Sequence, residues 1–255
     1  MGLRSETRNE ALFAADATRG RRVLLAFPKY EASFGTFEYA YPIMGVKAFM
    51  PPQGLLVIAA ALPAHWQVKF VDENIRPVRR AEFAWADAVF VSGMHIQRAR
   101  IHDLCARAHA SGKTVVVGGP SASACPEYYP DADYLHIGEL GDATEELIAR
   151  LERDTARPPA QVRLTTKERL DLAAFPLPAY ELCRLDRYFM GSIQFSSGCP
   201  YDCEFCDIPA LYGRNPRLKR PEQITAELDK MRAHGLRNAV YFVDDNFIGN
   251  RRAVR

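Results

Sequence analysis

The sequence has no long apolar run. Its longest, Leu55–Leu62, is too short to cross a bilayer. The first 22 residues are polar and mixed in charge, without the apolar core that a secretory signal needs. We therefore expect no transmembrane segment and no secretory leader, and we predict a cytoplasmic protein. Peripheral contact with a membrane surface stays open.

An excess of one charge is also missing, because 33 Lys and Arg face 31 Asp and Glu for a net charge of +2. This balance gives no electrostatic basis for binding nucleic acid. The sequence contains neither a Gly-x-Gly-x-x-Gly fingerprint nor a Walker lysine loop, so dinucleotide and nucleoside-triphosphate sites are not indicated. With 48% hydrophobic and 25% charged residues, the composition is that of an ordinary globular protein.

Cysteine is scarce, and half of it is clustered. Of six cysteines, three are scattered (Cys105, Cys125, Cys183) and three follow the spacing Cys-x3-Cys-x2-Cys (Cys199, Cys203, Cys206). Thiolates this close together can ligate one iron–sulfur cluster. Three ligands to a four-iron cluster leave one iron open to a substrate or cofactor.

The spacing leaves two other uses of these cysteines open. A structural zinc site needs a fourth ligand, and only His234 follows, within a helical pattern. A disulfide framework is disfavoured because cytosolic thiols stay reduced. The cluster is the favoured interpretation, with zinc kept as an alternative.

Short apolar runs alternate with helical patterns through the first part of the chain. We predict five strands, separated by helices over 54–62, 97–110 and about 142–153: Val23–Phe27, Val68–Asp72, Ala88–Ser92, Thr114–Val117 and Tyr134–Ile137. Parallel neighbours need crossover helices, so this order predicts an α/β fold with a doubly wound, Rossmann-like parallel sheet. The predicted division is an N-terminal tail (1–21), this domain (22–154), a Pro-rich linker (155–190) and a second α/β unit (191–255).

The second unit is predicted to contain strand Ser192–Phe195, helix Pro221–His234 and strand Asn238–Val243. A basic run lies between the cysteines and this helix (Arg214, Arg217, Lys219, Arg220). We interpret it as a solvated loop, with a contact to an anionic ligand or an acidic partner as the alternative.

Ligands of open α/β sheets bind beyond the carboxyl ends of the strands. Six residues of the first domain fall in such loops: Ser92, His95, Gly118, Gly119, Ser121 and Glu139. Glycines there allow the backbone to approach a large flat ligand closely. They serve equally well as tight turns in a domain that is only a scaffold.

Several stretches together carry a family resemblance: Phe27–Tyr30, Val71–Asn74, Ser92–Gln97, Val117–Pro120, the cysteine loop with Phe205 before its third cysteine, and Phe242–Phe247. In these stretches the sequence resembles the cobalamin-binding class of radical S-adenosylmethionine (SAM) proteins, and within it the subgroup that contains the hopanoid C-2 methylase.

The resemblance implies a cobalamin-binding domain followed by the start of a partial (β/α)6 barrel. It implies that the three clustered cysteines hold a [4Fe-4S] cluster whose open iron binds SAM, which is cleaved to a 5′-deoxyadenosyl radical. Phe205, Asp244, Asp245 and Asn246 would lie near SAM, and the six loop residues near cobalamin. The implied reaction is cobalamin-dependent methylation of an unactivated carbon in an apolar, hopanoid-like small molecule. A flavodoxin- or ferredoxin-type protein would supply electrons.

Two departures from the family pattern stand out. The Asp-x-His-x-x-Gly motif, whose histidine ligates cobalt in many cobalamin proteins, is absent after the first strand. His95 faces cobalt or SAM, or it is an ordinary hydrogen-bonding residue. The barrel also has only its first βα unit and second strand, so we expect a C-terminally truncated chain. The competing function is a non-catalytic protein that binds cobalamin or another ligand.

Overall fold

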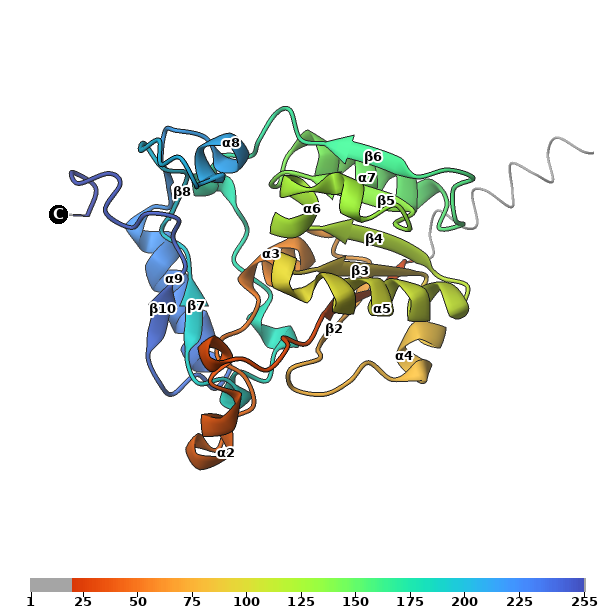
Figure 1. The fold of residues 1–255 in the computed structure, drawn as a ribbon, viewed down its shortest axis with the longest axis horizontal. Coiled ribbons are helices and arrows are strands. Elements are labelled where there is room, and N and C mark those ends of the chain that lie inside the picture. Colours follow the sequence, from red (N-terminus) through yellow and green to blue (C-terminus); the bar gives the residue numbers. More distant parts are fainter. Residues whose placement is uncertain (1–19, 255) are drawn as a thin grey trace, which may run out of the picture.

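The structure is a computed structural model that describes residues 20–254 (Figure 1). Its larger part is a six-stranded parallel sheet in the order β2-β1-β3-β4-β5-β6. The strands are β1 (Arg22–Phe27), β2 (Gln67–Asp72), β3 (Ala88–Ser92), β4 (Thr114–Gly118), β5 (Tyr134–Ile137) and β6 (Val162–Thr165). β1, β3 and β4 are almost entirely buried, as expected for apolar runs at the centre of a parallel sheet.

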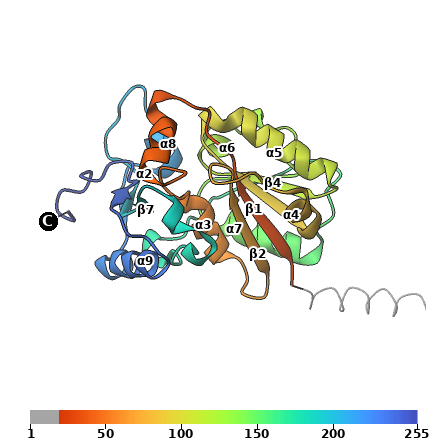
Figure 2. The same cartoon turned by 90° about the horizontal axis from the view of Figure 1, so that it is seen from below.

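Helices cover both faces of this sheet (Figure 2). On one face lie α4 (Arg80–Trp85), α5 (Arg98–Ala110) and α6 (Pro120–Ala124), and on the other α3 (Gln53–Ala61) and α7 (Asp142–Arg153). Alternate residues of β1 divide between the two cores: Leu24 packs with Ile101 of α5, whereas Leu25 belongs to the core that contains Leu147 of α7. The predicted doubly wound parallel sheet is confirmed.

The prediction of five strands is wrong by one among the described residues. β6 pairs with β5 along the edge of the sheet and lies inside the segment predicted to be an irregular linker. Only Leu164 of this strand is buried, so its apolar pattern is too short to identify it from the sequence. The domain boundaries themselves stay a prediction.

The remaining chain forms a smaller α/β unit. β7 (Gly191–Ile193) and β10 (Val240–Phe242) pair in parallel, and α9 (Pro221–Ala233) connects them. β7 is shorter than predicted and begins one residue earlier. Between them, β8 (Ser196–Ser197) pairs antiparallel with β9 (Arg217–Leu218), and α8 (Ile208–Tyr212) follows the cysteines.

A third apolar core joins the two parts. Leu56 of α3 and Tyr180 of the connecting segment pack with Ile193 of β7 and Met231 of α9. The shorter elements are α2 (Tyr41–Met44) and the 3-10 turns η1 (Phe34–Thr36), η2 (Glu38–Ala40), η3 (His95–Gln97), η4 (Pro126–Tyr128), η5 (Leu172–Ala174), η6 (Tyr180–Leu182) and η7 (Leu185–Arg187).

The described residues can be compared with two predictions, one about membrane spans and one about the N-terminal tail. No helix within residues 20–254 combines the length and apolar character that a membrane span requires. The predicted N-terminal tail lies outside the described residues except for its last two. Of these, Arg21 is buried and donates a hydrogen bond from Nε to the carbonyl oxygen of Leu151 (3.0 Å).

Candidate functional site

The loops after β1 and β3 are fixed to each other by one buried amide. Gln97 is fully buried; its Nε2 donates to the carbonyl oxygen of Pro28 (2.5 Å), and its Oε1 accepts from the backbone N–H of Met94 (2.9 Å). Because β1 and β3 are neighbours in the sheet, this side chain holds two adjacent loops at the carboxyl edge. The sequence interpretation included Gln97 in a motif but did not assign it this role.

Gly118, the last residue of β4, and Gly119, which follows it, lie in different surroundings. Gly119 has φ +87°, and a Cβ there would lie 2.1 Å from Oγ of Ser92. A side chain at this position would therefore clash with the neighbouring loop, whatever ligand binds. A Cβ at Gly118 would make ordinary contacts with His136, at 3.4 Å from its Cβ and 3.5 Å from its carbonyl oxygen. Ser92, Gly118 and Gly119 thus lie together at the edge, as predicted, while their contact with cobalamin stays a prediction.

His95 and Ser121 also meet at this edge. The Nδ1 atom of His95 lies 2.8 Å from Oγ of Ser121, which lies 2.5 Å from the hydroxyl of Tyr129. Ser121 and Tyr129 are buried, whereas His95 is exposed. Burial raises the pKa of Tyr129, so the phenol stays protonated at neutral pH and can donate or accept in this group.

The cysteine loop begins at β8 and is shaped by a glycine. Gly198 has φ +94°, and a Cβ there would lie 2.8 Å from the carbonyl oxygen of Gly213. That carbonyl also accepts from the N–H of Cys199 (3.1 Å). Cys203 is exposed and Cys206 is half-buried, and the Phe205 side chain is 93% exposed.

The end of β10 is bound to the start of this loop. Asp244 accepts from the backbone N–H of Phe195 (3.2 Å) and from Oγ of Ser196 (2.5 Å). Asp245 accepts from the N–H of Gly198 (2.8 Å), and burial raises the pKa of its carboxyl group.

Asn246 completes this contact, because its Nδ2 donates to Sγ of Cys199 (3.4 Å). Three of the four residues predicted to lie near SAM, Asp244, Asp245 and Asn246, thus come together against the cysteine loop. Their own contacts are with the protein, and a role in binding SAM stays a prediction.

Glu139, predicted to contact a cofactor, connects the two parts of the chain. It follows β5, and its Oε1 accepts from Oγ of Ser197 (2.9 Å), directly before the cysteine loop. Its Oε2 forms an ion pair with Arg217, which also donates to Oγ of Ser197 (3.0 Å), and lies 3.8 Å from Arg169. The carboxyl edge of the large sheet and the cysteine loop are therefore in direct contact.

The interpretation of the basic run as solvated is wrong for two of its members. Arg217 makes the contacts just described, and Lys219 is buried in an ion pair with Glu227. The partners come from distant elements, so the sequence spacing alone gave no sign of them.

The side chains at this junction suit an iron–sulfur cluster in their chemistry. Three free thiols lie in one loop, and all six cysteines of the chain are unbridged. Nη1 of Arg217 is buried and has no hydrogen-bond partner among the described residues, which leaves a donor for an acceptor atom of a bound cofactor. Within residues 20–254, no three His, Cys, Asp or Glu side chains are placed to share a single metal ion.

A buried carboxylate at the end of β2 was missed by the sequence interpretation. Asp72 accepts from the backbone N–H of Asn74 (2.7 Å) and from the hydroxyl of Tyr188 (2.9 Å). Burial raises its pKa to about 6. The motif containing Asp72 was recognised, but its partner lies 116 residues away in the connecting segment.

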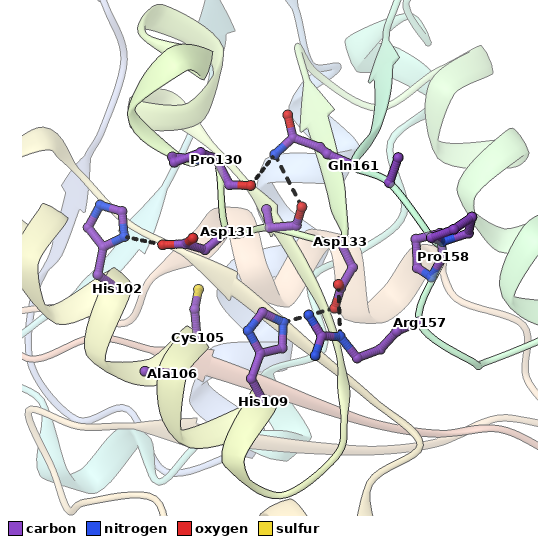
Figure 3. A pocket seen from close by; sticks show the side chains of 13 residues that line it. His102, Cys105, Ala106, His109, Pro130, Asp131, Asp133, Arg157, Pro158 and Gln161 are labelled. Atoms are coloured by element: carbon purple, nitrogen blue, oxygen red, sulfur yellow. Dashed lines mark hydrogen bonds and ion pairs between the residues drawn. The ribbon is translucent and has the colours of Figure 1, made fainter.

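A cavity of about 350 Å³ lies at the opposite, amino-terminal edge of the large sheet (Figure 3). Its polar side chains pair with one another: His109 lies 2.9 Å and Arg157 3.0 Å from Asp133, and His102 lies 3.9 Å from Asp131. The Arg157 pair attaches the segment after α7 to the residue before β5, and the two histidine pairs attach α5 to the same stretch. None of the predicted site residues lines this cavity.

Comparison with known proteins bears on the large sheet and its edge. A sequence profile of the B12-binding domain matches residues 43–148. The part of the chain that contains these residues is called the B12-binding domain below, after this match. This match contains the strands β2 to β5 and the loops in which the cobalamin residues were predicted.

Sequence similarity to curated proteins extends beyond the B12-binding domain. Over 242 residues the chain is 64% identical to the hopanoid C-2 methylase of Rhodopseudomonas palustris, covering 94% of this chain and 46% of that protein. It is 43% identical to an uncharacterized methyltransferase of Synechocystis, covering 92% of this chain and 43% of that protein. The chain spans about half the length of these curated relatives.

Solved structures show the same fold at low identity. OxsB, a cobalamin-dependent SAM radical enzyme solved with aqua-cobalamin and SAM bound, matches with a TM-score of 0.61 at 18% identity, over 91% of this chain and 35% of that one. TsrM of Kitasatospora setae, a radical SAM methyltransferase with cobalamin and a [4Fe-4S] cluster bound, matches with a TM-score of 0.59 at 19% identity, over 92% and 51%. The predicted resemblance to cobalamin-binding radical SAM proteins is confirmed, and so is the predicted fold class.

Proposed function

We propose that this chain takes part in cobalamin-dependent, radical SAM methylation of an unactivated carbon in an apolar, hopanoid-like substrate. The observation that carries the proposal is the contact of Glu139 with Ser197 and Arg217. Through it the edge of the B12-binding domain meets the cysteine loop, which brings the two candidate cofactor sites together. The hopanoid C-2 methylase similarity supports the substrate class.

In this proposal the protein holds and orients two cofactors. When bound, the [4Fe-4S] cluster supplies the electron that cleaves SAM, and cobalamin carries the methyl group. The thiolates of Cys199, Cys203 and Cys206 would hold the cluster. Asp244 and Asp245 would position the loop by accepting its backbone N–H groups, since both carboxylates are already engaged there.

An aromatic cluster next to these residues supports an apolar substrate. The ring of Phe247 lies 5.8 Å from that of Phe195 and 4.9 Å from that of Phe242, between centroids. Phe242 and Phe247 are both 38% exposed, so they offer apolar surface close to Asp244. Such surface would contact a hydrocarbon and exclude water from the reacting atoms.

The cellular setting follows from the same chemistry. Thiolate ligands need a reducing compartment, which supports a cytoplasmic location and a flavodoxin- or ferredoxin-type electron donor. The exposed side of the cysteine loop, around Cys203 and Phe205, is the accessible route for such a donor.

The test is anaerobic reconstitution with iron and sulfide, followed by reduction and electron paramagnetic resonance (EPR) with and without SAM. We expect a four-iron signal that changes when SAM is added. Cys203→Ser should abolish this signal, whereas Cys125→Ser, outside the loop, should leave it intact. Cobalamin retained without any SAM-sensitive cluster would favour the competing, non-catalytic ligand-binding function. Bound zinc in place of iron would identify a structural site.

A further inference from the structure

A chain of three polar groups runs from the interior of the B12-binding domain to the imidazole of His95. The hydroxyls of Tyr129 and Ser121 are 2.5 Å apart, and Oγ of Ser121 lies 2.8 Å from Nδ1 of His95. Tyr129 and Ser121 are 1% and 2% exposed, respectively. One buried hydroxyl, that of Ser121, thus contacts a nitrogen of an exposed ring and is itself contacted by a second buried hydroxyl, that of Tyr129.

The other ring nitrogen of His95, Nε2, has no hydrogen-bond partner among the described residues. The ring is nevertheless held in place. Tyr128 packs edge-on against it with 6.1 Å between centroids, and the guanidinium of Arg98 lies over Tyr128 at 4.6 Å. Gln97 fixes the backbone of the same turn. His95 therefore presents Nε2 from a rigid support at the ligand-binding edge of the sheet.

We propose that Nε2 of His95 ligates the cobalt of a cobalamin bound at this edge, with Ser121 and Tyr129 as positioning residues. This inference rests on the proposed function, because it requires cobalamin to bind. Metal-bound histidines characteristically donate their other ring N–H to a fixed acceptor, which sets the tautomer and the ring orientation. Ser121 is such an acceptor.

The protons of the group fit this assignment. In this assignment Nδ1–H of His95 would donate to Oγ of Ser121, and the Ser121 hydroxyl would donate to the oxygen of Tyr129. Nε2 is then unprotonated, and its lone pair forms the bond to cobalt in place of a water molecule. No electron is transferred, and the imidazole stays neutral.

The topology of the sheet explains how a histidine after β3 reaches this position. β1 pairs directly with β3, so the loops that follow these two strands lie side by side. The sequence has no Asp-x-His-x-x-Gly motif after β1. A ligand supplied by the next loop would occupy the same region of the edge.

The test uses the full chain, produced with nitrogen-15 histidine, loaded with cobalamin and reduced to the cobalt(II) state. We expect the EPR spectrum to show splitting by one nitrogen that changes with the label, which separates the protein ligand from cobalamin's own base. His95→Gln should remove this label-dependent splitting. His102→Gln is the matched control, because His102 stacks on the same Tyr129, at 5.5 Å, and should leave it unchanged.

Ser121 gives a second readout. Ser121→Ala should lower the share of nitrogen-ligated cobalt, and Ser121→Thr should restore it, since only a hydroxyl accepts from Nδ1–H. Circular dichroism checks that each variant is folded. Bound cobalamin whose splitting ignores the label, or a label-dependent splitting that survives in His95→Gln, overturns the ligand assignment and leaves the proposed function standing. Failure of the unsubstituted chain to retain cobalamin overturns both.

Discussion

Asp72 shows how much a single side chain can do where the two parts of the chain meet. It ends β2 and is 4% exposed, and its carboxylate accepts from Tyr188 in the connecting segment. Its pKa of about 6 compares with an ordinary value of 3.8. That difference corresponds to roughly 3 kcal/mol of preference for the protonated form in the folded chain.

The sign of this effect sets a pH dependence. Because the folded chain holds the proton more tightly than the unfolded chain, the contribution to stability is fully present below about pH 4. It is lost as the pH rises through about 6. We expect the free energy of unfolding of the Asp72→Asn variant to change less over this pH window than that of the unsubstituted chain. At pH 8 the variant should be the more stable of the two.

Urea unfolding between pH 4 and pH 8 measures this difference. Asp229→Asn, on the exposed side of α9, is the control and should follow the unsubstituted chain at every pH. If the unfolding free energy of Asp72→Asn shows the same pH dependence as that of the unsubstituted chain, the Asp72 carboxylate titrates at its ordinary pKa. Our account of its burial is then wrong.

At the scale of elements, a buried ion pair connects the cysteine region to α9. Lys219 follows β9, and its side chain and that of Glu227 in α9 are each 1% exposed. Nε2 of Gln53, at the start of α3, donates to Glu227 (3.2 Å), so three elements meet at one carboxylate. Such a pair is costly to break, because one charge is left buried without a partner.

We therefore expect Lys219→Met to lower the free energy of unfolding by about 3–5 kcal/mol. Adding Glu227→Gln should recover most of this loss, since the uncompensated charge is removed. Lys230→Met is the matched control on the same helix, because its partner Glu181 is 48% exposed. It should cost no more than about 1 kcal/mol. Denaturant titration of the unsubstituted chain, the two single variants and the double variant measures these differences. Equal losses of unfolding free energy in Lys219→Met and Lys230→Met would contradict the argument.

The elements differ in how readily the sequence predicts them. β5 and α7 have the predicted bounds, because β5 is a short, almost continuously buried run and the apolar residues of α7 follow a helical period. β6, β8 and β9 were missed, since each is held by pairing with distant residues rather than by its own pattern. The same reason explains why the sequence indicated His95 as a site residue but not Tyr129. His95 was indicated by its position after a strand, whereas the role of Tyr129 depends on a contact with Ser121 that only the folded structure reveals.

At the scale of the whole molecule, the third core makes the two parts interdependent. It contains Leu56 from the B12-binding domain and Met231 from the smaller unit, with Tyr180 and Tyr188 between them. These four buried side chains, which come from three segments of the chain, should couple the stability of the two parts.

The two tryptophans allow this coupling to be measured. Trp66 precedes β2 and Trp85 ends α4, so both report on the large sheet alone. Circular dichroism reports on helices of both parts. We expect the two signals to change together during urea unfolding, as one transition. A dichroism change that precedes the fluorescence change would mean that the smaller unit unfolds by itself.

The segment between the two parts, residues 155–190, is folded onto both of them. It contributes β6 to the large sheet and Tyr180 and Tyr188 to the shared core. A flexible tether of this length would let its ends sample many separations, and the local concentration of one ligand near the other would depend on tether length. Here the spacing between a ligand at the sheet edge and one at the cysteine loop is a property of the packed protein, set once when the chain folds.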